Sequence, residues 1–188
     1  MRAHATSAGM ANGYVSAPAE GPLALHAELL RHDSATQALE HWCHLHGAAA
    51  GARVVALRVR SVEVQPSALQ RCRLRAAKGE VVRHRRVRLL CGALYLAEAD
   101  NWYLPHRLTP AMNWLLDWTD TPFGRAVQGL RFRRRLLAAD LLGPPAAGSG
   151  PGPVLRHRAL LVGADGLPLA EVVESYTREA VFLPDGGR

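Results

Sequence analysis

Residues 81–91 carry the side chains best suited to binding an acid. This stretch reads VVRHRRVRLLC, so four arginines and a histidine precede a purely apolar end. Side chains alternate across a strand, and here the odd-numbered positions form the more apolar face. That face should meet the core, which turns Arg85 inward and leaves Arg86 and Arg88 outside. A buried guanidinium is costly unless an anion accompanies it.

A second inward charge is expected on the last strand, residues 169–176. Its even-numbered positions place Glu174 among apolar side chains, whereas Glu171 belongs to the other face. An inward arginine and an inward glutamate have two interpretations. They form a mutual salt bridge, or they bound a small pocket in which the arginine binds a carboxylate and the glutamate stands at the far end.

The elements that would carry these residues do not alternate regularly between strand and helix. Strands are expected at residues 52–64, 79–91, 94–104 and 154–176, the last containing a hairpin turn at 164–166. Helices are expected at 23–31, 34–46, 108–118 and 125–143, the second starting at a capping box of Ser34 with Gln37. This order predicts a single α+β domain around an antiparallel sheet.

Composition sets the broad class of the protein. The 188 residues carry a net charge of +7 and a pI of about 10.1, which favours anionic partners. Three cysteines without CxxC spacing indicate a reducing, cytoplasmic setting. Residues 1–22 contain no apolar signal region and are expected to be a disordered leader, followed by a domain at 23–183 and a tail at 184–188. No apolar run is long enough to cross a membrane.

Four stretches together resemble the chorismate lyases (chorismate pyruvate-lyases), including the actinobacterial branch that forms 4-hydroxybenzoate. They are LLRHDSATQALEHW, RRVRL, LLDWTDTPFGRAV and DGLPLAEVVESYTREAVF, and they occur in the family's order. The resemblance implies an antiparallel sheet with helices packed on one side and helical flaps over a buried ligand pocket.

The resemblance also implies roles for individual residues. The carboxylate-binding arginine falls on Arg85, although an alignment on Leu-Leu-Cys would choose Arg86. The catalytic glutamate falls on Glu174, and a backbone N–H that binds the ligand carboxylate falls on Phe123. A further ligand contact in the first flap falls on Ala35. The hairpin after Leu90 is shorter than in relatives.

The reaction implied by the resemblance is loss of pyruvate from chorismate to give 4-hydroxybenzoate. It involves no redox change, and we expect neither a cofactor nor a metal. Arg85 would fix a carboxylate, and Glu174 would serve in proton transfer. Two alternatives stay open: a non-catalytic module of the same fold that binds a small aromatic acid, or a basic nucleic-acid binder. The lack of a helix-turn-helix pattern before Leu23 counts against a complete regulator, and the oligomeric state is left open.

Three further features have plain structural interpretations. His41, Cys43, His44 and His46 share one helix. A metal site there is one interpretation, but their spacing and the lack of a distant carboxylate or thiol motif favour reading the histidines as surface and flanking residues. The basic segment at 131–137 is interpreted as the solvated side of an amphipathic helix, not as a polyanion site. Cys91 is interpreted as a core thiol, since no base is evident beside it.

Overall fold

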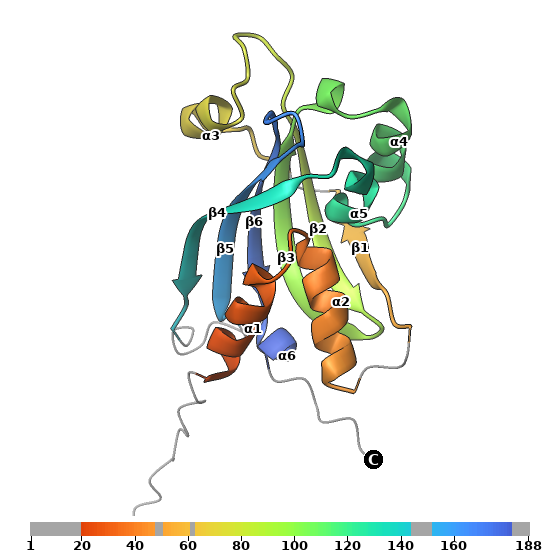
Figure 1. The fold of residues 1–188 in the computed structure, drawn as a ribbon, viewed down its shortest axis with the longest axis vertical. Helices are drawn as coiled ribbons and strands as arrows, with labels where there is room; N and C mark the ends of the chain where they lie inside the picture. The colour runs from red at the N-terminus through yellow and green to blue at the C-terminus, as the bar shows by residue number, and fades with distance from the viewer. Residues whose placement is uncertain (1–19, 48–50, 61–62, 144–151, 182–188) are drawn as a thin grey trace, which may run out of the picture.

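A six-stranded antiparallel sheet organises the computed structural model, which describes residues 20–47, 51–60, 63–143 and 152–181 (Figure 1). The strand order is β1-β2-β3-β6-β5-β4. The strands are β1 Val54–Arg58, β2 Arg83–Cys91, β3 Leu94–Tyr103, β4 Arg133–Leu141, β5 Leu155–Val162 and β6 Pro168–Tyr176. The expected α+β fold around an antiparallel sheet is confirmed.

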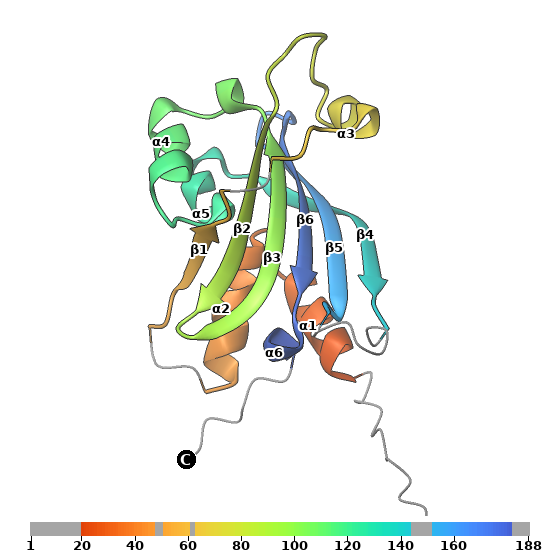
Figure 2. The ribbon, with the colours of Figure 1, turned by 180° about the vertical axis from the view of Figure 1, so that it is seen from behind.

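Helices cover mainly one face of this sheet. They are α1 Glu20–Leu30, α2 Ala35–Leu45, α3 Ala68–Arg73, α4 Pro110–Trp118, α5 Phe123–Ala126 and α6 Arg178–Val181. The helices α1, α2 and α6 lie in front of the strands in Figure 1 and behind them in Figure 2. The helix α3 packs against the opposite face, where Leu74 meets Trp102 and Leu160. Among the described residues, no helix is both long and apolar enough to span a membrane.

The chain termini bear on the expected leader and tail. The structure places residues 20–22 in α1, so the helix begins three residues earlier than the expected boundary at Leu23. Residues 1–19 of the expected leader and the whole tail at 184–188 lie outside the described residues, as does most of the expected loop at 143–153.

Strand β2 has the faces that its alternation predicts. Arg85 and Val87 are buried, Arg88 is exposed, and Arg86 is half-buried at the other face in an ion pair with Asp100. The hairpin to β3 turns at Gly92, whose φ of 60° favours glycine. Arg85 is therefore the inward arginine of the two that the sequence offered.

The expected helix at 125–143 is wrong. Its first residues form α5 and a short 3-10 turn, Gln128–Leu130, after which Arg131 adopts a left-handed φ of 48°. The rest is β4, which pairs antiparallel with β5 at the edge of the sheet. Pairing with β5 supplies the backbone hydrogen bonds that a helix would have supplied, so tertiary context overrides helix propensity.

The junction of α2 with α5 is tightly packed. Ser34 caps α2 by accepting a hydrogen bond from the Gln37 N–H, which is one half of the expected capping box. Glu40 joins α2 to its neighbours because its carboxylate accepts from the Val54 N–H and pairs with Arg125 of α5. A Cβ on Gly124 would lie 2.6 Å from Ser34 Oγ, so only glycine fits there without displacing the cap.

We expect Gly124→Ala to lower the free energy of unfolding by about 1 kcal/mol, the usual cost of a lost N-cap. The measurement is urea unfolding followed by circular dichroism. Gly129→Ala is the matched control, since its added Cβ would come no closer than 3.5 Å, to Met112 Cε. Equal stability of the two variants would show that the α2–α5 junction accommodates the extra methyl group.

Candidate ligand-binding site

A small cavity lies between the inner face of the sheet and the first residues of α2 and α5. Its walls are Asp33, Ser34, Ala35, Thr36, Val87, Leu89, Ala99, Asn101, Pro122, Phe123, Gly124, Phe132, Arg134, Leu161, Val172 and Glu174. The volume of this cavity is about 30 Å³, which is enough for one or two water molecules. Three residues named from the sequence, Ala35, Phe123 and Glu174, meet at this cavity.

Glu174 is held by two donors. Its Oε2 accepts from Arg134 Nη2 at 2.5 Å and from the Tyr176 hydroxyl at 2.9 Å. Burial is the largest single influence and lowers the pKa of Arg134, but the charges of Glu174 and Tyr176 and the hydrogen bond to Glu174 together outweigh it, so the pKa is raised. Burial and the Glu174 charge raise the pKa of Tyr176 well above its ordinary value, so the phenol stays a donor. Glu174 is thus an acceptor fixed from two sides.

His157 of β5 extends this network away from the cavity. It is fully buried, pairs in register with Glu174 and accepts at Nδ1 from Arg134 Nη2, 3.3 Å away. A donor at Nδ1 leaves the ring proton on Nε2, which then donates to His26 Nδ1 at 2.8 Å. Burial first, and then the charge of Arg134, lower the pKa of His157 to about 4. The imidazole is therefore neutral around pH 7.

Arg85 lies beside the cavity but is not part of its wall. It is 1% exposed, and its Nη2 donates to the carbonyl oxygens of Thr119 and Thr121 at 3.4 and 3.2 Å. Its Nε and Nη1 are buried without a hydrogen-bond partner, and no carboxylate of the described residues pairs with it. Burial is the main cause that lowers its pKa to about 10.

The interpretation of Arg85 and Glu174 as a mutual salt bridge is wrong. Arg85 lies in register with Asn101 and Val172, whereas Glu174 lies in register with Ala99 and Val87. Strand β3 separates the two charged residues, so about 10 Å of sheet divides their strands. Glu174 has Arg134 as its partner instead.

Arg134 is the site residue that the sequence analysis missed. It belongs to the basic segment at 131–137 that was expected to be the solvated side of a helix. In the strand that forms instead, Arg134 points inward, like Phe132 just before the strand, while Arg133 and Arg135 are exposed. The Nε of Arg134 is buried without a partner. The alternation that selected Arg85 would have selected Arg134 had the segment been read as a strand.

Arg85 also borders a second, wider hollow at the β1–β2 edge. Its volume is about 410 Å³, and its walls include Arg58, Arg60, Arg83 and Arg86. Three of these arginines are already paired, Arg58 and Arg83 with Asp117 and Arg86 with Asp100. The buried guanidinium of Arg85 thus belongs to the wall of the wider hollow, while its neighbours Val87 and Asn101 line the small cavity.

Comparison with known proteins gives one close relative and several structures of similar fold. No family model matches the chain. The chain is 40% identical to the uncharacterized protein y4mC of Sinorhizobium fredii over 177 residues. The aligned region covers 85% of this chain and 75% of that protein. The chain belongs to the y4mC family.

The structural likeness extends to a bacterial protein of different sequence. The effector domain of PhnF from Mycobacterium smegmatis is 12% identical with a TM-score of 0.58, covering 77% of this chain and 88% of that domain. The structure of PhnF from the same organism gives the same identity and TM-score, covering 80% of this chain and 66% of that one. At these identities the likeness shows the fold alone, and that fold is the one the sequence analysis expected.

The neutral state of His157 predicts a pH dependence of stability. The folded protein keeps the imidazole neutral down to about pH 4, whereas the unfolded chain takes up a proton below its ordinary pKa of 6.5. The unfolded state binds more protons between these values, so stability falls as the pH drops from 6.5 to 4, by up to about 3 kcal/mol. Urea unfolding of wild type and His157→Gln across this range measures the difference.

The variant His157→Gln should lose most of this pH dependence, while His44→Gln, at an exposed position of α2, should keep it. Parallel curves for wild type and His157→Gln would mean that folding does not lower the pKa of His157.

Proposed function

We propose that the chain is a ligand-binding domain for a small organic acid with a flat, apolar body. The observation that carries this proposal is the Arg85 guanidinium, which is buried beside the cavity with Nε and Nη1 unpartnered. Removing one partner from a buried hydrogen bond to a charged group costs free energy, so unsatisfied N–H groups of this kind are rare in native proteins. A carboxylate accepts from two parallel N–H groups of a guanidinium at once, one on Nη2 and the other on either Nε or Nη1.

The cavity offers further donors and an apolar bed for the ligand. Arg134 contributes a second buried, unpartnered Nε in the wall itself. The first residues of α2, Ala35 and Thr36, line the cavity, and the N-terminus of a helix favours negative charge. Val87, Leu161 and Val172 supply an apolar surface under the ligand. This combination fits an aromatic or cyclic carboxylate better than a bare inorganic anion.

Binding requires the cavity to widen. The space of about 30 Å³ holds water, whereas pockets for small organic ligands usually have about 300 Å³ or more. The segment from Asp33 to Thr36 and the turn from Thr119 to Phe123 form the covering side, and they correspond to the flaps expected from the sequence. Opening here would also release Arg85 Nη2 from the two threonine carbonyls.

The solved structure of similar fold supports a binding role. That structure is described as the effector domain of PhnF. A domain of this kind needs a pocket but no catalytic group, and in this chain Glu174 is already engaged by Arg134 and Tyr176.

Chorismate lyase activity is the second candidate function. One observation favours it: Ala35, Phe123 and Glu174, which the family resemblance selects, all line one cavity. In this proposal Arg85 and Arg134 bind the carboxylates of chorismate, and Glu174 transfers the proton during loss of pyruvate. For that role Glu174 must be released from Arg134 when the substrate enters.

Acid binding is tested with 4-hydroxybenzoate and its uncharged analogue 4-hydroxybenzamide, by calorimetric titration. We expect the acid to bind and the amide to bind at least about tenfold more weakly, because charged hydrogen bonds contribute roughly 1.5–3 kcal/mol. Arg85→Met should weaken acid binding by a similar factor. Arg88→Met is the matched control on the exposed face of the same strand. Equal losses in the two variants, or equal binding of acid and amide, would contradict the proposal.

Turnover is tested by incubating the protein with chorismate and identifying products by chromatography and mass spectrometry. If the lyase proposal holds, 4-hydroxybenzoate and pyruvate form, and Glu174→Gln lowers the rate at least about 100-fold, the usual contribution of a general acid or base. Glu171→Gln is the control, because Glu171 is buried on the opposite face of the same strand, paired with Arg73. Intact chorismate together with 4-hydroxybenzoate binding would leave a binding domain without catalysis.

A further inference from the structure

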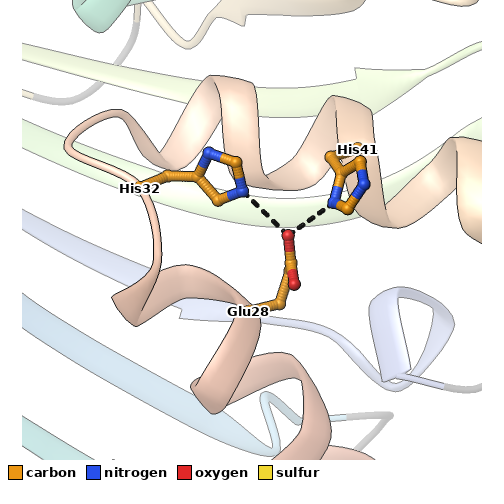
Figure 3. Close-up of side chains that lie close together, drawn as sticks. All are labelled: Glu28, His32 and His41. Atoms are coloured by element: carbon orange, nitrogen blue, oxygen red, sulfur yellow. Dashed lines mark hydrogen bonds and ion pairs between the residues drawn. The ribbon is translucent and has the colours of Figure 1, made fainter.

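Three side chains of metal-binding type converge where α1 meets α2. Glu28 comes from α1, His32 from the turn that follows it, and His41 from α2. Figure 3 shows both imidazoles directed at the same carboxylate oxygen. Glu28 Oε1 lies 2.8 Å from His32 Nε2 and 2.6 Å from His41 Nδ1, and one ligand atom from each residue lies within 4.8 Å of the other two. The sequence analysis grouped His41 with its helix neighbours and missed this arrangement.

The burial of the three residues suits a site that is fixed on one side and open on the other. Glu28 is 3% exposed, whereas His32 and His41 are 29% and 49% exposed at their side chains. An anchored carboxylate with two accessible imidazoles leaves room for an ion to enter and for a water molecule to complete its coordination.

We propose that Glu28, His32 and His41 bind a transition-metal ion of the Zn²⁺ class. Two imidazole nitrogens, one carboxylate oxygen and a water make a tetrahedral set that zinc accepts. Metal–ligand bonds of about 2.0–2.2 Å would separate the ligand atoms slightly more than the hydrogen bonds do. The exposed imidazoles can move outward by that amount. Arg31 binds the other carboxylate oxygen, Oε2, at 3.2 Å and so can keep Glu28 oriented.

The ion would join α1 to α2 across the turn that covers the cavity. His32 directly precedes Asp33, Ser34 and Ala35, which line the cavity wall. Fixing His32 and His41 to Glu28 would restrict this turn and so stabilise the packing of α2. The metal site does not depend on the proposed function, since its ligands lie outside the cavity wall.

The test uses the full chain after treatment with a chelator, titrated with Co²⁺ and then with Zn²⁺. We expect one Co²⁺ per chain with the visible absorption bands of tetrahedral cobalt, displaced by one Zn²⁺. His41→Ala and His32→Ala should each weaken binding by more than about tenfold, because each removes a direct ligand. Zn²⁺ should raise the melting temperature of wild type but not that of His41→Ala.

Two controls separate this site from adventitious binding. His44→Ala removes another exposed histidine of α2 and should bind like wild type. The second control is His4→Ala, which removes a histidine near the N-terminus, outside the described residues. No binding by wild type, or binding that survives His32→Ala and His41→Ala, would overturn the proposal. His41 is exposed, so its replacement should not prevent folding, and circular dichroism checks this.

Discussion

The ion pair between Arg134 and Glu174 is the interaction on which the candidate site depends. It connects the edge strand β4 to β6 across β5, with His157 of the intervening strand held between them. Strand β3 separates Glu174 from Arg85, so that carboxylate does not pair with Arg85. Two charges are thus paired on one half of the sheet, while a third is buried without an ion pair on the other half.

The buried charge of Arg85 is the energetically unfavourable feature of the candidate site. A buried guanidinium without an anion is unfavourable, and the lowered pKa of Arg85 expresses this cost. The fold supports it through a well-packed apolar face and two carbonyl acceptors from one turn. Buried groups with perturbed pKa values cluster at functional sites. An acid that reached Arg85 would satisfy groups that the protein alone leaves unsatisfied.

The covering side of the site is built differently from the sheet. The turn between α1 and α2 is held at one end by the Ser34 cap and the close approach of Gly124, and at the other by the contacts of Glu28 with His32 and His41. These are a few local polar contacts, whereas the strands are joined by continuous backbone pairing. The sheet therefore fixes the charged groups, while the turn is the part that can respond to a ligand or an ion.

The sequence by itself determined which side chains point inward on the strands that it predicted, because alternation with a period of two is a local property. This placed Arg85 and Glu174 on the inner face and left Arg88 outside. Only the tertiary structure decided which charges meet. Strand order places Arg134 diagonally across β5 from Glu174. Pairing with β5 makes residues 133–141 a strand, where the sequence pattern predicted a helix. Helix packing likewise brought His41 to Glu28. Partnerships of this kind depend on non-local geometry, which no local pattern of residues encodes.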